Sequence, residues 1–284
     1  MIKKVTVVGG GVMGKQIALN CAINGMETNL VDNVEAALEK VGEWSKEYLS
    51  GRVAKGKMTQ DEMDAAVAKF HLMSDMEAAC KDTDLVIEAI VEKLEAKKSL
   101  FETLDKITPE HTILVSNSST FKPSSLCGST NRADRVANLH YFNPALQMKL
   151  VEIVISPETS EETVAELEEF AKATNKVPIK VLKEIDGFVV NNILGGITKV
   201  AWFLLENGYA SAEDIDLGAE KGLGHPMGPF KTLDLAGLDT ILDVRRARYE
   251  AFGDESEKPP KILEEMVARG ELGRKSGKGF YEYK

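Results

Sequence analysis

Cysteine, positive charge and long apolar runs are all scarce in this sequence. Its 284 residues include three cysteines, Cys21, Cys80 and Cys127, which lie far apart and form no C-x-x-C pair. A disulfide framework or a structural zinc site is therefore not expected, and the composition favours reduced core thiols in a cytoplasmic protein. The apolar stretches fall well short of the ~18 residues that a membrane span needs, so no membrane segment is predicted.

The second scarcity is positive charge. Lys and Arg number 35 against 45 Asp and Glu, which gives a formal net charge of −10. This excess disfavours nonspecific attraction to nucleic acid or to an anionic membrane, so neither partner is predicted. An acidic ligand would need a local basic patch.

The pattern that is present alternates strands with helices. Val5–Val8 is a short β-branched run typical of a strand buried on both faces, an apolar helix follows and stops at Gly25, and residues 28–32 form a second strand. The sequence predicts further strands at residues 85–89, 112–116, 136–140, 150–154 and 177–181, and helices over 92–105 and from Ser160. Pro178 favours an edge position for the last of these strands.

Two segments depart from this alternation. Residues 34–70 are expected to form an inserted helical hairpin, whose second helix opens with a capping box of Thr59 and Glu62. Ser74 and Glu77 are expected to cap a short helix after it. After Asp186 only helical periodicity remains. The predicted fold is α/β, with a Rossmann-like doubly wound sheet over residues 1–185 and an all-α C-terminal domain over residues 186–284.

A glycine motif carries the first functional prediction. Gly9-x-Gly11-x-x-Gly14 follows a strand and opens a helix, as in dinucleotide-binding folds. The glycines allow a tight turn, a close approach of backbone to a pyrophosphate, and close packing of helix on strand. The N–H groups of the helix N-terminus, at Val12 and Met13, would face the phosphates. The alternative is a structural glycine turn with no nucleotide.

An acidic residue extends the motif. Asp32 ends the next strand and can accept hydrogen bonds from a ribose 2′-OH. A 2′-phosphate would meet a like charge there, and Asn33 rather than an arginine follows. The sequence therefore predicts NAD, not NADP, as the cofactor.

The candidate catalytic pair is His140 and Glu152. His140 ends a predicted strand, and Glu152 lies twelve residues further on, across a loop over residues 143–148 that reverses the chain. The two side chains should then lie opposite each other and form a hydrogen bond. Such a bond fixes the imidazole tautomer, which suits a general base. Ser119 follows another strand end nearby.

These motifs resemble those of the short-chain 3-hydroxyacyl-CoA dehydrogenase family. The resemblance covers essentially the whole chain, and the length suits its single-function bacterial members, which commonly act on 3-hydroxybutyryl-CoA in butyrate-type metabolism. The matching segments are residues 116–119, 140–144, 148–152, 187–191, 224–230 and 273–281.

The resemblance implies roles for individual residues. His140 would be the general acid/base and Glu152 its orienting carboxylate, while Ser119 and Asn191 would bond the reacting oxygen and the cofactor or substrate. The positions that match cofactor contacts are Asp32, Glu92, Lys97, Asn143 and Lys275. Those that match coenzyme A contacts are Ser50 and Lys57, with Arg52 and Lys55 close by. The sequence departs from the family pattern at Asn192, where Arg is usual, and at Gly51, where related clostridial-type sequences often have Lys.

The resemblance implies the reversible NAD(H)-dependent reduction of acetoacetyl-CoA to (S)-3-hydroxybutyryl-CoA. The alternatives are a related dehydrogenase of a small hydroxy or sugar acid, and a noncatalytic NAD-binding protein, against which the His140–Glu152 pair and Ser119 argue. The helix from Gly187 to about Asn207 is apolar nearly all round, so it should be buried on all sides. A homodimer through the C-terminal domain would achieve this.

Overall fold

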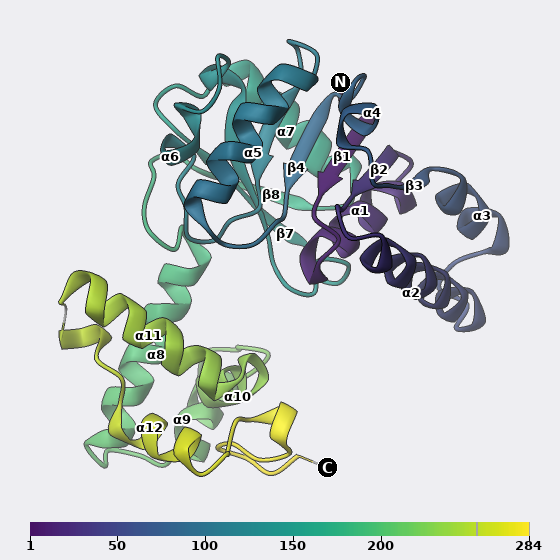
Figure 1. Ribbon diagram of the computed structural model, residues 1–284. Coiled ribbons are helices and arrows are strands. Elements are labelled where there is room, and N and C mark those ends of the chain that lie inside the picture. The colour runs from purple at the N-terminus through teal and green to yellow at the C-terminus, as the bar shows by residue number, and fades with distance from the viewer. Residues whose placement is uncertain (254, 284) are drawn as a thin grey trace. The chain divides into compact units, whose positions relative to one another are not determined.

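The computed structural model describes residues 1–253 and 255–283, which form two compact units, Met1–Val189 and Val190–Lys284 (Figure 1). The first unit is α/β and the second is helical, as the sequence predicts. Within the described residues, none of the helices is both long enough and apolar enough to cross a membrane.

The first unit is built on an eight-stranded sheet in the order β3-β2-β1-β4-β5-β6-β7-β8. Neighbouring strands are parallel except β6 and β7, which pair antiparallel. The order reverses between β1 and β4, and ligands of such sheets bind in the crevice at that point. The strands are β1 Lys4–Val8, β2 Glu27–Val31, β3 Phe70–Met73, β4 Leu85–Glu88, β5 Ile113–Ser116, β6 Val136–Tyr141, β7 Leu150–Ile155 and β8 Val177–Val181.

Helices cover both faces of this sheet, which makes it doubly wound. Val5 and Val7 of β1 pack on one face with Ile17 of α1 and Leu167 of α7. Val86 and Leu114 pack on the other face with Phe101 of α5. The helices of this unit are α1 Val12–Ile23, α2 Glu35–Ala54, α3 Gln60–Ala68, α4 Met76–Cys80, α5 Leu94–Ile107, α6 Ser124–Cys127 and α7 Glu161–Ala173.

The predicted helical hairpin is present as α2 and α3, which extend away from the sheet at its β3 edge (Figure 1). The capping box is confirmed: the Glu62 N–H donates to Thr59 Oγ at 3.2 Å, and the Thr59 N–H donates to Glu62 Oε2 at 2.8 Å. At the opposite edge of the sheet lies β8, which carries Pro178 as predicted.

The structure differs from the sequence-based prediction in three local details. Asp75, not Ser74, caps α4, because its carboxylate accepts the N–H of Ala78 at 3.0 Å. The strand β3 was not predicted, because its four residues are all only partly buried and lack the apolar run of the central strands. Helix α5 begins at Leu94, two residues later than expected, and this leaves Glu92 in the preceding loop.

The second unit packs its helices around three aromatic rings. The ring centroids of Trp202 and Phe230 lie 5.4 Å apart, and those of Phe230 and Phe280 lie 4.5 Å apart. Its helices are α8 Val190–Glu206, α9 Ala212–Leu217, α10 Pro229–Ala236, α11 Leu238–Phe252 and α12 Lys261–Ala268, with a short π-helical segment at Gly218–Gly222 and short 3₁₀ turns at Glu255–Glu257 and Arg274–Ser276.

Two buried aspartates fasten the C-terminal segment to these helices. Asp216 accepts the N–H of Phe230 and the hydroxyl of Tyr281, both at 2.8 Å. Asp234 accepts the N–H of Tyr281 at 3.0 Å and the hydroxyl of Tyr283 at 2.9 Å. Burial and the Asp234 carboxylate raise the pKa of Tyr283 to about 12, so the phenol remains a donor at neutral pH. These bonds hold in place the turn that carries Lys275.

Helix α8 was expected to be buried on all sides with the help of a second copy of the chain, and its own unit buries only part of it. Thr198, Ala201 and Trp202 are buried. Ile193 is 58% exposed and Phe203 is 54% exposed. The other helices of the second unit therefore cover only part of the apolar surface of α8.

Candidate active site

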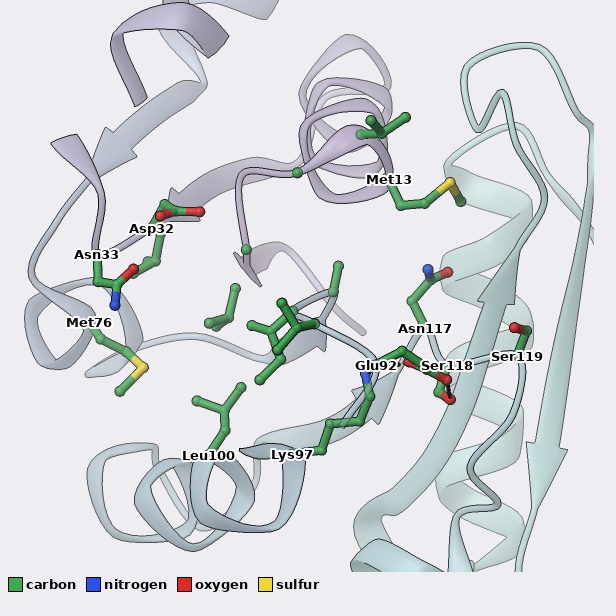
Figure 2. Close-up of a pocket in the computed structure, with 18 of the residues that line it drawn as sticks. Met13, Asp32, Asn33, Met76, Glu92, Lys97, Leu100, Asn117, Ser118 and Ser119 are labelled. Atoms are coloured by element: carbon green, nitrogen blue, oxygen red, sulfur yellow. Dashed lines mark hydrogen bonds and ion pairs between the residues drawn. The ribbon is translucent and has the colours of Figure 1, made fainter. Parts of the chain in front are cut away.

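A cavity of about 970 Å³ opens at the point where the strand order of the sheet reverses (Figure 2). Its size suits a cofactor, since ligand pockets typically span ~300–1,000 Å³. Its lining comes from the carboxyl ends of β1, β2, β4 and β5 and from the loops that follow them. Eight residues predicted to contact the cofactor line it: Gly9, Gly11, Val12, Met13, Asp32, Glu92, Lys97 and Ser119.

The glycine loop is shaped by close approaches of the backbone. Gly9 has φ of +111°, and a Cβ there would lie 2.5 Å from the carbonyl oxygen of Ala89. A Cβ on Gly14 would lie 1.8 Å from the carbonyl oxygen of Gly9. At Gly11, in contrast, a Cβ would meet nothing within 4 Å, so this residue presents its backbone to the open cavity.

The N-terminus of α1 has free N–H groups that can bind an anion. Its N-cap residue is Gly11, and no side chain caps the first N–H groups. Free N–H groups and the helix dipole together attract a phosphate. The loop therefore fits the pyrophosphate of a dinucleotide.

Asp32 is fixed at one end of the cavity (Figure 2). The N–H of Gly10 donates to its Oδ2 at 2.7 Å, and the N–H of Val34 donates to its Oδ1 at 2.9 Å. An ionised carboxylate can accept about four hydrogen bonds, so both oxygens keep capacity for ribose hydroxyls.

The opposite end of the cavity holds Glu92, Lys97, Asn117, Ser118 and Ser119 (Figure 2). Lys97 Nζ lies 3.0 Å from Glu92 Oε2, and the Ser118 hydroxyl donates to Glu92 Oε1. Apolar side chains such as Ile90 and Leu100 also line the cavity.

His140 and Glu152 are directly paired residues of β6 and β7. The Nδ1–H of His140 donates to Glu152 Oε2 at 2.7 Å, as the sequence predicts. Glu152 is fully buried, and its other oxygen, Oε1, accepts the N–H of Val189 at 2.9 Å. With Nδ1 occupied, Nε2 of His140 is the nitrogen left to exchange a proton.

Aromatic rings surround the imidazole. The ring centroid of Phe142 lies 4.6 Å from that of His140, and the centroid of Phe188 lies 5.5 Å from it. Phe188 is fully buried and has φ of +51°, in the left-handed region that a bulky side chain rarely adopts. This turn brings the N–H of Val189 to Glu152, and strain of this kind is typical of functional sites.

Ser119 belongs to a loop that is bonded to the His140 strand. Ser116 of β5 pairs with Asn138 of β6, so the two chains leave the sheet side by side at the same edge. Asn117 Oδ1 accepts the N–H of Tyr141 at 2.9 Å, and Asn138 Nδ2 donates to the carbonyl oxygen of Phe121 at 2.7 Å. The loop therefore carries the exposed Ser119 next to the strand end that carries His140.

A second cavity, of about 780 Å³, lies against the C-terminal half of α2. Arg52, Lys55 and Lys57 line it, and so do Trp44 and Tyr48, whose rings are stacked with centroids 5.7 Å apart. The Nε of Arg52 is buried and has no hydrogen-bond partner among the described residues. Ser50 is exposed on α2 but does not line this cavity, whereas Gly51 does.

The remaining predicted residues lie elsewhere. Asn143 is exposed in the loop between β6 and β7. Asn191 and Lys275 belong to the second unit, Asn191 in the first turn of α8 and Lys275 in an ion pair with Asp239 at 2.6 Å.

Three residues that shape the site were missed. Glu88 is fully buried at the end of β4, and the sequence signal for it is an acidic residue in an otherwise apolar strand. Lys176 donates to the carbonyl oxygens of Ala145 and Met148 and so holds the β6–β7 loop; burial, and then the nearby Lys149, lower its pKa. The left-handed turn at Phe188 has no sequence signal apart from the preceding Gly187.

Comparison with known proteins decides the family. Residues 4–185 match the model of the 3-hydroxyacyl-CoA dehydrogenase NAD binding domain, and residues 187–283 match the model of the C-terminal domain of the same enzymes. The chain belongs to the 3-hydroxyacyl-CoA dehydrogenase family. It is an NAD-dependent oxidoreductase, as predicted.

Relatives of this dehydrogenase span its whole length. The mitochondrial hydroxyacyl-coenzyme A dehydrogenase of Homo sapiens is 41% identical over 100% of this chain and 92% of its own. The 3-hydroxybutyryl-CoA dehydrogenase of Clostridioides difficile is 38% identical over 99% of both chains. The crystal structure of (S)-3-hydroxybutyryl-CoA dehydrogenase from Ralstonia eutropha superimposes with a TM-score of 0.90, at 38% identity over 100% of both chains.

The fixed carboxylate of Asp32 should make this dehydrogenase discriminate against NADPH. Replacing it by alanine (Asp32→Ala) removes both the ribose acceptor and the charge that repels a 2′-phosphate. We expect the ratio of kcat/KM for NADH over NADPH to fall by about 10- to 100-fold, since each tenfold corresponds to ~1.4 kcal/mol. Steady-state kinetics with both cofactors measures this ratio.

A matched variant separates charge from structure. Asp32→Asn keeps an oxygen that can accept the N–H of Gly10 but removes the charge, so it should also relax the preference. Equal kcat/KM values for NADPH and NADH in the unsubstituted enzyme would contradict the assignment.

Proposed function

We propose that this enzyme is a cytoplasmic (S)-3-hydroxybutyryl-CoA dehydrogenase that reversibly reduces acetoacetyl-CoA in butyrate or fatty-acid metabolism. The observation that carries the proposal is the buried pair of His140 and Glu152, bonded at 2.7 Å with Nε2 of the imidazole left to act. Full-length bacterial relatives named 3-hydroxybutyryl-CoA dehydrogenase, 36–38% identical, support the substrate. The three cysteines are free and buried, which suits a reducing compartment.

His140 acts as the general acid/base. In reduction, its protonated Nε2 gives a proton to the ketone oxygen at carbon 3, and in oxidation it takes the hydroxyl proton. Glu152 stabilises the imidazolium electrostatically and holds the ring in one orientation through Nδ1. Tyr141, the next residue, is buried in the core that also holds Ile17 of α1, and burial raises the pKa of its phenol well above 10.

Ser119 and Asn191 would donate hydrogen bonds where negative charge develops on the substrate oxygen. When bound, NADH supplies the hydride for carbon 3. We assign its pyrophosphate to the loop of Gly9, Gly11, Val12, Met13 and Gly14, its adenosine ribose to Asp32, and the remaining contacts to Glu92, Lys97, Ser119, Asn143 and Lys275.

The second cavity is our candidate for the nucleotide end of coenzyme A. It gathers three cations, Arg52, Lys55 and Lys57, on a chain whose net charge is −10, and so forms the local basic patch that an acidic ligand needs. The unpaired Nε of Arg52 offers a buried donor, and the stacked Trp44 and Tyr48 offer an aromatic surface. Ser50 lies on the same helix.

We propose that residues 1–185 form the NAD-binding domain and also carry the candidate coenzyme A cavity, whereas residues 186–284 supply the dimer interface and the substrate contact of Asn191. The exposed apolar side chains of α8, including Ile193, Val200 and Phe203, support a homodimer, because exposed apolar patches mark interaction surfaces.

The unsubstituted enzyme should oxidise NADH when acetoacetyl-CoA is added, and the variant His140→Asn should lose about 10²- to 10⁴-fold in kcat, the usual contribution of a positioned acid/base. The dissociation constant for NADH should barely change. His71→Asn, which alters a half-exposed histidine paired with Glu27, is the control and should keep full activity. Near-normal turnover in His140→Asn would remove this residue from the mechanism.

The same assay distinguishes the alternatives. A small 3-hydroxy acid that is turned over as efficiently as the thioester would favour a hydroxy-acid dehydrogenase. No turnover of either substrate, with NADH still bound, would indicate a noncatalytic protein.

Lys57→Ala should raise KM for acetoacetyl-CoA several-fold and leave kcat unchanged, because the cation is assigned to the nucleotide end of the substrate. A truncated thioester without that end should be nearly unaffected. Lys46→Ala, an exposed lysine of α2 outside the cavity lining, is the matched control. Equal losses on both substrates would make Lys57 structural.

Light scattering during size-exclusion chromatography should give about twice the chain mass of 31.1 kDa. Phe203→Glu should shift the mass toward the monomer, because an unpaired charge in an apolar interface costs several kcal/mol. Lys46→Glu in the first unit should not. A monomeric unsubstituted enzyme would overturn the proposed dimer.

A further inference from the structure

We propose that a ring of hydrogen-bonded groups at one end of the 970 Å³ cavity shifts cofactor binding toward the oxidised form. The ring consists of Glu88, Lys97, Glu92, Ser118 and Ser116. The residue that determines the net charge of this ring is Glu88, which is not assigned to any contact with the cofactor. The proposal rests on the cofactor placement given above.

The ring is closed. Glu88 Oε1 accepts Lys97 Nζ at 2.6 Å, and its Oε2 accepts the hydroxyl of Ser116, also at 2.6 Å. Lys97 Nζ reaches Glu92 Oε2 at 3.0 Å, and Glu92 accepts the hydroxyl of Ser118. The N–H of Ser118 donates to Ser116 Oγ at 3.0 Å and completes the circuit.

The charges in this ring do not cancel. It holds two carboxylates and one ammonium group, which gives a net charge of −1. Glu88 is 0% exposed and Lys97 is 1% exposed, so these two form a buried ion pair. The side chain of Glu92 is 41% exposed and lines the cavity. Because Lys97 is shared by Glu88 and Glu92, one net negative charge remains on the three groups, and Glu92 brings it to the cavity wall.

This charge lies at the nicotinamide end. Asp32, the ribose-binding residue of the fingerprint, marks the adenosine end, and Glu92 and Lys97 lie at the opposite end of the cavity (Figure 2). The nicotinamide ring is positively charged in NAD⁺ and neutral in NADH. A negative charge beside a partly desolvated cation is stabilising and is weakly screened by salt. The ring of side chains should therefore favour NAD⁺ binding and lower the reduction potential of the bound cofactor.

A purely structural role makes a different prediction. The ring also joins the loops that follow β4 and β5, so damage to it could weaken binding of both cofactor forms alike. A lost contact to a ribose hydroxyl would likewise affect both forms. The ratio of the two dissociation constants is insensitive to both effects and reports the charge.

The test is to measure the dissociation constants of NAD⁺ and NADH by calorimetry, without acyl-CoA, in the full-length enzyme. Glu88→Gln and Glu92→Gln each bring the net charge of the ring to zero, and we expect both to raise the ratio of the NAD⁺ constant to the NADH constant by about 5- to 10-fold. Ser116→Ala breaks two hydrogen bonds of the ring without changing its charge, and should leave the ratio unchanged. Glu95→Gln, an exposed residue of α5, is the surface control.

Two results would overturn the proposal: an unchanged ratio in Glu92→Gln, or a shift in Ser116→Ala as large as that in Glu88→Gln. Glu92 is partly exposed, so its variant keeps the test valid if the buried Glu88→Gln fails to fold. Because acyl-CoA is absent, the result does not depend on the proposed substrate. An unsubstituted enzyme that binds neither NAD⁺ nor NADH would instead reject the cofactor placement.

Discussion

The position of the catalytic pair depends on the antiparallel pairing of β6 with β7, in a sheet whose other neighbouring strands are parallel. The loop over residues 142–149 reverses the chain and places residues twelve apart in sequence directly opposite each other, whereas a parallel connection needs a long crossover. The pairing sets His140 against Glu152 inside the sheet. Lys176 then holds the reversing loop, and the turn at Phe188 supplies the second donor to Glu152.

Buried carboxylates with several donors recur throughout the molecule. Glu88 and Glu152 each accept at least one backbone N–H, and Asp216 and Asp234 do the same in the second unit. A buried carboxylate that lost its partners would be strongly destabilising, so each one fixes the segments that donate to it. In this acidic protein, negative charge is thus used as a structural anchor as well as for binding.

The sequence is informative where a short motif fixes the geometry. The glycine fingerprint with Asp32, and the spacing of His140 and Glu152 across a turn, predict contacts that lie close in the chain or follow from strand order. Glu88 and β3 could not be predicted in the same way. The ring around Glu88 joins α5 to the ends of two strands, and β3 is a short, half-exposed strand that exists because β2 pairs with it. Such features depend on tertiary contacts that a local pattern does not record.

The steric closeness of the glycine loop also limits how the cofactor site can change over evolutionary time. A side chain at Gly14 would collide with the Gly9 carbonyl at 1.8 Å, and one at Gly9 would collide with Ala89, so these positions admit almost no drift. The segment after β2 is different: Asn33 and Val34 are exposed and lie beside Asp32. Changes of cofactor preference in descendants of this fold would therefore arise at the end of β2, while the sequence of the glycine loop stays the same.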